Sequence, residues 1–162
     1  MGEHRVEILP DMTIEWDVPI PMDDGVVLRA DVFRPNGTGR HPVIMTHGPY
    51  GKNLSFSQGW PTQFNALTTA WPEVLEGSSG RFHVWETVDP EKWVPEGYVC
   101  LRVDARGSGQ SPGYLNPFSP REIDDYAACI EWAGVQDWSD GKVGLNGISY
   151  YAITRWLVAA RQ

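Results

Sequence analysis

Ser149 lies where the sequence pattern changes from strand to helix. Residues 143–146 form a short, mostly apolar run that predicts a buried strand, residues 147–149 predict a sharp turn, and a helix is predicted to begin at about Tyr150. A serine at such a turn projects its hydroxyl away from the backbone, and the N-terminus of the following helix directs N–H groups towards the group under attack. This arrangement, a nucleophile elbow, indicates acyl transfer through a covalent serine intermediate. The alternative is that Ser149 merely caps the last helix.

Two further apolar runs predict the strands that must lie beside this elbow. Residues 42–46 suit a strand buried on both faces, and they lead into a loop at residues 47–51. Residues 97–104 predict a second buried strand. Strand, crossover helix and strand in succession predict parallel pairing, so we expect an α/β fold.

The crossover helix between the last two strands has strong start signals. Ser119 is the expected N-cap, Pro120 stands at the first helical position, and Glu122 completes a capping box. Gly134 suits a C-terminal cap. Apolar side chains follow at helical spacing, at Ile123, Tyr126, Ala127 and Ile130.

The N-terminal part of the chain predicts an antiparallel hairpin. Residues 14–21 and 26–34 alternate apolar and polar side chains around a turn signal at residues 23–25. We expect residues 1–12 to form a loosely held lead-in and residues 13–162 to form the N-terminal portion of a single α/β domain.

Residues 52–92 are rich in aromatic side chains separated by Pro, Gly and Ser. They predict a long connection packed over the core, with one or two short helices near residues 62–70. Because long ordered loops often carry sites, part of this connection is alternatively expected to wall a substrate pocket.

Composition excludes several classes of function. The net charge of −8 argues against nucleic acid or an anionic membrane as a partner. Cys100 and Cys129 each lie in an apolar run and are expected to be small core residues, and no Cys/His cluster has ligand spacing, so we expect neither a metal nor another cofactor. No apolar run approaches the length of a membrane span, and the N-terminus lacks an apolar signal region, so a cytoplasmic location is expected.

Four stretches carry a more specific resemblance. Nearly the whole chain resembles the N-terminal part of the catalytic domain in the cocaine-esterase and X-Pro dipeptidyl-peptidase family of α/β-hydrolases. The last two of the four are highly characteristic of that family. The matching stretches are residues 22–35, 42–52, 103–111 and 144–152.

This resemblance implies roles for three residues. Ser149 would be the acylating nucleophile, the Tyr50 hydroxyl would donate a hydrogen bond to the oxyanion, and the backbone N–H of Tyr150 would be the second donor. Two donors directed at a developing alkoxide lower the barrier by a few kcal/mol. Tyr50 could instead be a core or turn tyrosine. Ala152 departs from the family pattern, which often has glycine there, and we expect only a small adjustment of the elbow.

The chain contains no obvious base for Ser149. In this fold the acid and then the histidine follow the serine, yet no Asp, Glu or His stands after Ser149. His47 belongs to the loop after a buried strand, where a structural role is expected. We therefore expect the chain taken alone to be an incomplete hydrolase with little activity. The strand at residues 143–146 is expected to expose an edge through which the chain could self-associate.

The leading interpretation is a serine hydrolase of small ester or amide substrates, either an esterase, an acylase or a dipeptidase that cleaves after proline. Two alternatives remain. One is a non-catalytic fragment or interaction remnant of a hydrolase. The other is a dinucleotide-binding oxidoreductase, because the glycine-rich residues 107–113 follow a strand as a phosphate-binding loop would. Its third glycine is one position late, and the next helix begins only near Ser119, which disfavours that reading.

Overall fold

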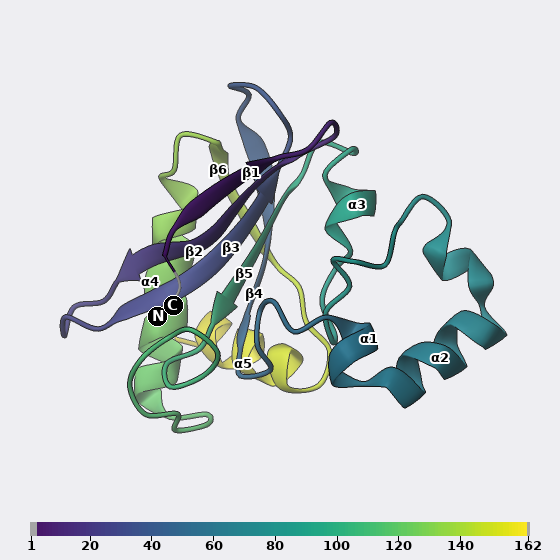
Figure 1. Cartoon of the computed structure of the whole chain (residues 1–162). Coiled ribbons are helices and arrows are strands. Elements are labelled where there is room, and N and C mark those ends of the chain that lie inside the picture. The colour runs from purple at the N-terminus through teal and green to yellow at the C-terminus, as the bar shows by residue number, and fades with distance from the viewer. Residues whose placement is uncertain (1–2, 162) are drawn as a thin grey trace.

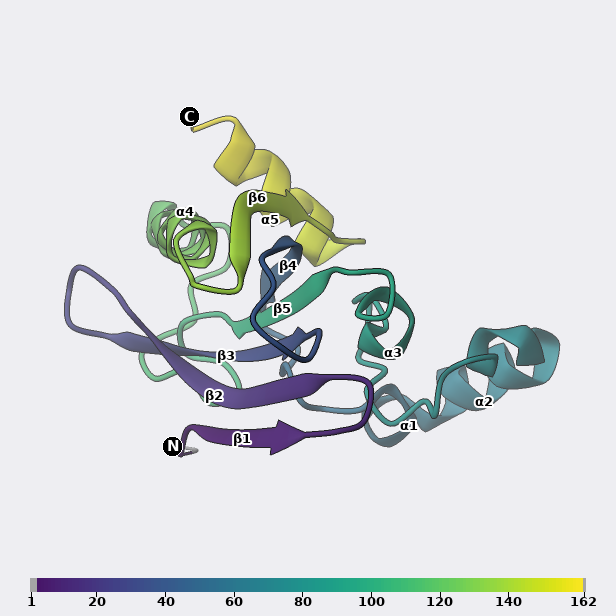
Figure 2. The same ribbon diagram turned by 90° about the horizontal axis from the view of Figure 1, so that it is seen from above.

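A computed structural model of the chain describes residues 3–161. It contains one mixed sheet with helices on both of its faces (Figures 1 and 2). The strands are β1 (Arg5–Ile8), β2 (Thr13–Pro21), β3 (Val27–Arg34), β4 (His41–Gly48), β5 (Val99–Asp104) and β6 (Ser139–Leu145); the helices are α1 (Phe56–Gly59), α2 (Pro61–Ala70), the 3-10 helix η1 (Pro72–Leu75), α3 (Pro90–Trp93), α4 (Pro120–Gly134) and α5 (Tyr150–Ala159).

The strand order is β1-β2-β3-β5-β4-β6. β1 to β3 pair in antiparallel fashion, as does β3 with β5, whereas β4 is parallel to both β5 and β6. The expected hairpin, parallel strands and crossover helix α4 are therefore confirmed, and β6 is an edge strand of the described sheet. The parallel pairing brings the carboxyl ends of β4 and β6 together at one edge.

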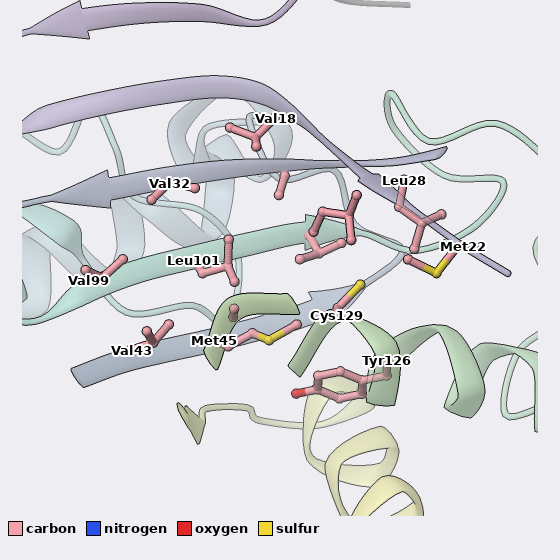
Figure 3. Close-up of a cluster of buried hydrophobic side chains, with 14 of the residues drawn as sticks. Val18, Met22, Leu28, Val32, Val43, Met45, Val99, Leu101, Tyr126 and Cys129 are labelled. Carbon is pink, nitrogen blue, oxygen red and sulfur yellow. The ribbon is translucent and has the colours of Figure 1, made fainter. Parts of the chain in front are cut away.

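The larger hydrophobic core lies between the sheet and the helices α4 and α5 (Figure 3). Alternation along β3 and β5 sends Val32 and Leu101 to this face, while Phe33 and Cys100 point to the opposite face and pack with Phe82 and Val94. Both cysteines are buried free thiols, as expected: Cys100 lies in β5 and Cys129 in α4.

The long aromatic-rich connection leaves the end of β4 and returns at β5. It contains α1, α2, η1 and α3, and Figure 1 shows α1 and α2 extending away from the sheet. The helix predicted near residues 62–70 is α2. None of the helices in residues 3–161 combines the length and apolar character that a membrane crossing requires.

Three local expectations need correction. Residues 1–12 include a strand, β1, which pairs with β2 although its side chains are mostly exposed. Gly134 is the last helical residue and Val135 the C-cap. The Ser119 hydroxyl accepts from the N–H of Glu122 at 3.3 Å as a cap should, but the Glu122 carboxylate accepts from the N–H of Phe118 at 2.6 Å and so does not close the box on Ser119. Phe118, whose N–H donates to the Glu122 carboxylate, has a left-handed φ of 59°.

Candidate active site

Ser149 stands in a strained turn between β6 and α5. Its φ of 54° and ψ of −118° lie in a region that non-glycine residues rarely occupy, and such strain persists only where the surrounding structure imposes it. The turn is tight, because a Cβ at Gly147 would lie 2.5 Å from the backbone carbon of Tyr151. The residue is exposed, and its hydroxyl makes no capping bond to the helix. Ser149 therefore occupies the N-cap position of α5 without capping the helix through its side chain.

Tyr50 lies just beyond the end of β4, beside Ser149. The Asn146 N–H donates to the Met45 carbonyl at 2.9 Å, so the β4–β6 pairing continues to the residue just before the elbow. The side chains of Tyr50 and Ser149, about a hundred residues apart in sequence, are within hydrogen-bonding reach of each other. Partial burial and the charge of Glu86 raise the pKa of the Tyr50 phenol, with the Ser149 contact opposing them, so the hydroxyl stays protonated and able to donate.

Tyr150 is the first residue of α5, so its backbone N–H is one of the four that no carbonyl of the helix can satisfy. Its hydroxyl donates to Glu122 Oε1 at 2.7 Å and its ring stacks on Phe118 at 4.6 Å. Burial and the adjacent Glu122 carboxylate raise the pKa of the Tyr150 phenol. The ring of Tyr50 meets that of Tyr150 edge-on at 6.1 Å. The structure thus brings the three expected site residues together.

His47 occupies the core beneath this site. Its ring is completely buried and stacks on Tyr126 at 4.8 Å, and neither ring nitrogen has a hydrogen-bond partner. Burial lowers the pKa of the imidazole to about 4. His47 cannot reach a substrate and is held neutral, which agrees with a structural role.

The remaining histidines make contacts elsewhere. His4 lies 3.6 Å from Glu15, His41 contacts the Gly97 carbonyl at 3.1 Å, and His83 pairs with Asp89 at 2.7 Å. Among the described residues, then, each histidine is engaged away from Ser149. No group of three or more His, Cys, Asp or Glu side chains in residues 3–161 is arranged to hold a metal ion.

The glycine-rich loop at residues 107–113 packs against the chain itself. A Cβ at Gly109 would collide with the Asp104 carboxylate, which also accepts the N–H of Gln110 at 2.8 Å. The next helix along the chain begins only at Pro120, and not directly after the loop as in a phosphate-binding motif. These glycines allow close packing around Asp104, and nothing in the loop favours the dinucleotide-binding reading.

Two further sets of residues lie near Tyr50, one in the aromatic connection that was alternatively expected to wall a pocket, and one that sequence reasoning missed. Part of the aromatic connection stands beside Tyr50: Trp60 meets the Tyr50 ring edge-on at 6.3 Å, and Trp85 stacks on Trp60 at 5.0 Å. The other set is a buried ion cluster centred on Lys52. The available signal for Lys52 was its place at the end of one of the four matching stretches, two residues after Tyr50.

Comparisons with known proteins agree with this geometry. The family described as X-Pro dipeptidyl-peptidase (S15 family) matches residues 24–162. Cocaine esterase of Rhodococcus sp. (strain MB1 Bresler) is 33% identical over 147 residues, which are 91% of this chain and 21% of that protein. A crystal structure of a CocE/NonD family hydrolase from Staphylococcus aureus is 40% identical with a TM-score of 0.77, over 93% of this chain and 25% of that one.

An α-amino acid ester hydrolase is more distant, at 25% identity and a TM-score of 0.62, over 89% of this chain and 22% of that one. The chain therefore spans only about a fifth to a quarter of the length of these relatives. The family match extends over most of the chain, from the β2–β3 turn through the elbow. Sequence, fold and the strained serine turn agree, and the chain belongs to the X-Pro dipeptidyl-peptidase (S15) family of α/β-hydrolases, with CocE/NonD family hydrolases among its relatives.

Proposed function

We propose that this chain supplies the nucleophile and the oxyanion-binding groups of a serine hydrolase that transfers the acyl group of an ester or amide to water. The observation that carries the proposal is the exposed Ser149, held in a strained turn within hydrogen-bonding reach of the Tyr50 hydroxyl. The family is one of serine esterases and peptidases, and the names of its members cover both esters and amides.

In this mechanism Ser149 Oγ attacks the substrate carbonyl carbon and forms a new C–O bond. The negative charge that collects on the carbonyl oxygen is met by the Tyr50 hydroxyl and the Tyr150 N–H, and each such donor contributes a few kcal/mol to lowering the barrier. The alcohol or amine then leaves with a proton, and the acyl-serine is hydrolysed by water in a second step.

We further propose that the general base lies outside these residues. In α/β-hydrolases the acid and the histidine follow the serine, whereas no Asp, Glu or His follows Ser149 here and His47 is inaccessible. A serine hydroxyl without a base is a poor nucleophile at neutral pH. The 162-residue chain alone should therefore acylate slowly, and added imidazole should accelerate it.

A fluorophosphonate probe tests this proposal. Intact-mass spectrometry should show one phosphonyl group per chain, formed faster as the imidazole concentration rises and mapped to Ser149 by peptide sequencing. Ser149→Ala should abolish the adduct, whereas Ser57→Ala, at an exposed serine in an ordinary helix, should leave it unchanged. A wild-type chain that never labels, or labelling that survives Ser149→Ala, would contradict the proposal and favour the non-catalytic alternative.

A further inference from the structure

Lys52 lies at the centre of a buried ion cluster close to Tyr50. Only 1% of its side-chain surface is exposed, and its ammonium lies 2.6 Å from Asp17 Oδ1 and 2.8 Å from Asp31 Oδ1. Its backbone N–H donates to Asp104 Oδ1 at 2.7 Å. The cluster therefore joins β2, β3 and β5 to the loop that follows β4.

The sheet is locally distorted to build this cluster. The register between β2 and β3 shifts between Glu15 and Val18, and within this bulge Asp17 has a left-handed φ of 55°. The Asp17 N–H donates to Asp31 Oδ1 at 3.0 Å, so the bulge places both carboxylates around the ammonium. A bulge with a strained non-glycine residue costs free energy, and such features persist mainly where they direct a side chain to a particular place.

The cluster is not an efficient way to stabilise a core. Two carboxylates flank one ammonium, the third, that of Asp104, accepts the backbone N–H of Lys52, and Asp31 Oδ2 is buried without a partner. Burial raises the pKa of Asp104 to about 6 despite hydrogen bonds from Gln110 and Lys52, and it also raises the pKa of Asp31. Well-packed apolar residues of similar volume often stabilise a fold as well as a buried ion cluster does. What the cluster provides instead is fixed geometry.

The fixed contacts constrain the loop that carries Tyr50. At the start of the loop, Gly48 pairs with Asp104, and its carbonyl accepts the Ala105 N–H at 2.9 Å. At the other end, Lys52 is held through both its backbone and its ammonium. Tyr50 lies between these two anchors. We infer that Lys52 is a positioning residue, whose ion pairs with Asp17 and Asp31 fix the loop that presents the Tyr50 hydroxyl to Ser149.

This inference rests on the proposed function. It predicts that the placement of Tyr50 and the stability of the fold can be changed independently. Lys52→Met alone leaves the carboxylates uncompensated and should destabilise the fold. In the triple variant Lys52→Met/Asp17→Asn/Asp31→Asn the ammonium and its two ion-pair partners are all neutral, Asp104 keeps its hydrogen bonds from the backbone N–H groups of residues 52 and 110, and most of the stability should return. The anchor at Lys52 Nζ is still absent from this variant, so Tyr50 should remain poorly placed.

The experiment measures Ser149 phosphonylation at saturating probe and fixed imidazole, together with ¹⁹F NMR of chains that carry 3-fluorotyrosine, with the Tyr50 signal assigned by Tyr50→Phe. In both Lys52 variants we expect the maximal rate constant to fall about tenfold or more, the probe concentration for half-maximal rate to stay nearly constant, and the Tyr50 signal to shift or broaden. Lys142→Met, at an exposed lysine, should change none of these quantities.

A triple variant that regains stability, the wild-type rate constant and the wild-type Tyr50 signal would overturn the inference, because it would show that the cluster acts only through stability. If the wild-type chain fails to label, the proposed function fails, and the ¹⁹F signal still decides the role of Lys52. A Tyr50 signal unchanged in both variants would then reject it.

Discussion

The two sides of the candidate site differ sharply in how the fold supports them. The Tyr50 side consists of β4 and the loop at residues 48–52, and β4 lies inside the sheet between β5, which is buried at every residue, and β6. The Ser149 side consists of β6 and α5. β6 is an edge strand with one buried residue, and α5 buries only three.

Because of this difference, the more firmly held elements lie on the Tyr50 side, and the proposed nucleophile lies on the other side. The Tyr50 side holds the buried ion cluster and the imidazole of His47, whereas the Ser149 side holds the strained turn and several exposed apolar side chains: Ile148, Ile153, Trp156 and Leu157. Sparse burial predicts that β6 and α5 open locally at a lower free energy than the strands beneath them. In the proposed mechanism, Tyr50 on the core would thus be a fixed reference for Ser149, which lies on a more weakly held element.

The largest expected effect comes from a comparison of two leucine substitutions, one in each of the strands that flank β4. Leu101→Ala removes a fully buried side chain from β5 and should lower the free energy of unfolding by about 2–5 kcal/mol. Leu145→Ala removes the same atoms from half-buried β6 and should cost about 1 kcal/mol. Urea denaturation of both variants measures the two values. Equal losses would show that the Ser149 side is as firmly packed as the core.

Sequence reasoning succeeded where the information was local. The elbow could be predicted because strand, glycine turn and helix follow one another within residues 143–150, and α4 because Ser119 and Pro120 mark its start. The cluster around Lys52 could not be predicted, because its four members come from four segments and depend on a strand order in which β5 lies between β3 and β4. The bulge at Asp17 was equally hidden, since the alternating pattern of β2 does not reveal an inserted residue.

Two further misses share one physical cause. β1 forms through backbone pairing with β2 and not through burial, since Val6 and Ile8 are 54% and 76% exposed. The strand therefore has no apolar periodicity from which it could be predicted. Glu122 was expected to bind the Ser119 N–H, but its carboxylate accepts instead from the Phe118 N–H, one residue earlier, and from the Tyr150 hydroxyl of α5. In both cases a partner outside the residues that carried the local pattern determined the outcome.

A second prediction concerns pH, to which the Tyr50 side should respond through His47. The folded chain holds this imidazole at a pKa of about 4, below the ordinary value of 6.5, so the unfolded chain takes up the proton first as the pH falls. The stability that the neutral imidazole contributes is complete above pH 6.5 and is lost on acidification to about pH 4, by on the order of 3 kcal/mol.

His47→Phe keeps a ring to stack on Tyr126 and should remove this loss. Asp104 works in the opposite direction, because its pKa of about 6 is raised, and the stability it contributes is lost as the pH rises through that value. The variant should therefore become relatively more stable than wild type as the pH falls from 6.5 to 4, measured by urea denaturation at several pH values. Parallel pH profiles for the two proteins would contradict the assignment.

The smallest effect is expected from Glu122→Gln, which tests how the Ser149 side is held. The carboxylate accepts both the Tyr150 hydroxyl and the Phe118 N–H, and a glutamine of the same shape offers one oxygen for these two donors. Losing one such hydrogen bond should cost about 1–2 kcal/mol in the free energy of unfolding. Removing the adjacent charge should also lower the pKa of Tyr150, which ultraviolet titration against a Tyr150→Phe variant can isolate.

Because Glu122 contacts α5 at its first residue, hydrogen exchange should accelerate in α5 while β4 and β5 keep their wild-type rates. Acceleration spread evenly over all three elements would mean that the two sides unfold as one unit, and the contrast between them would then lie in exposure alone.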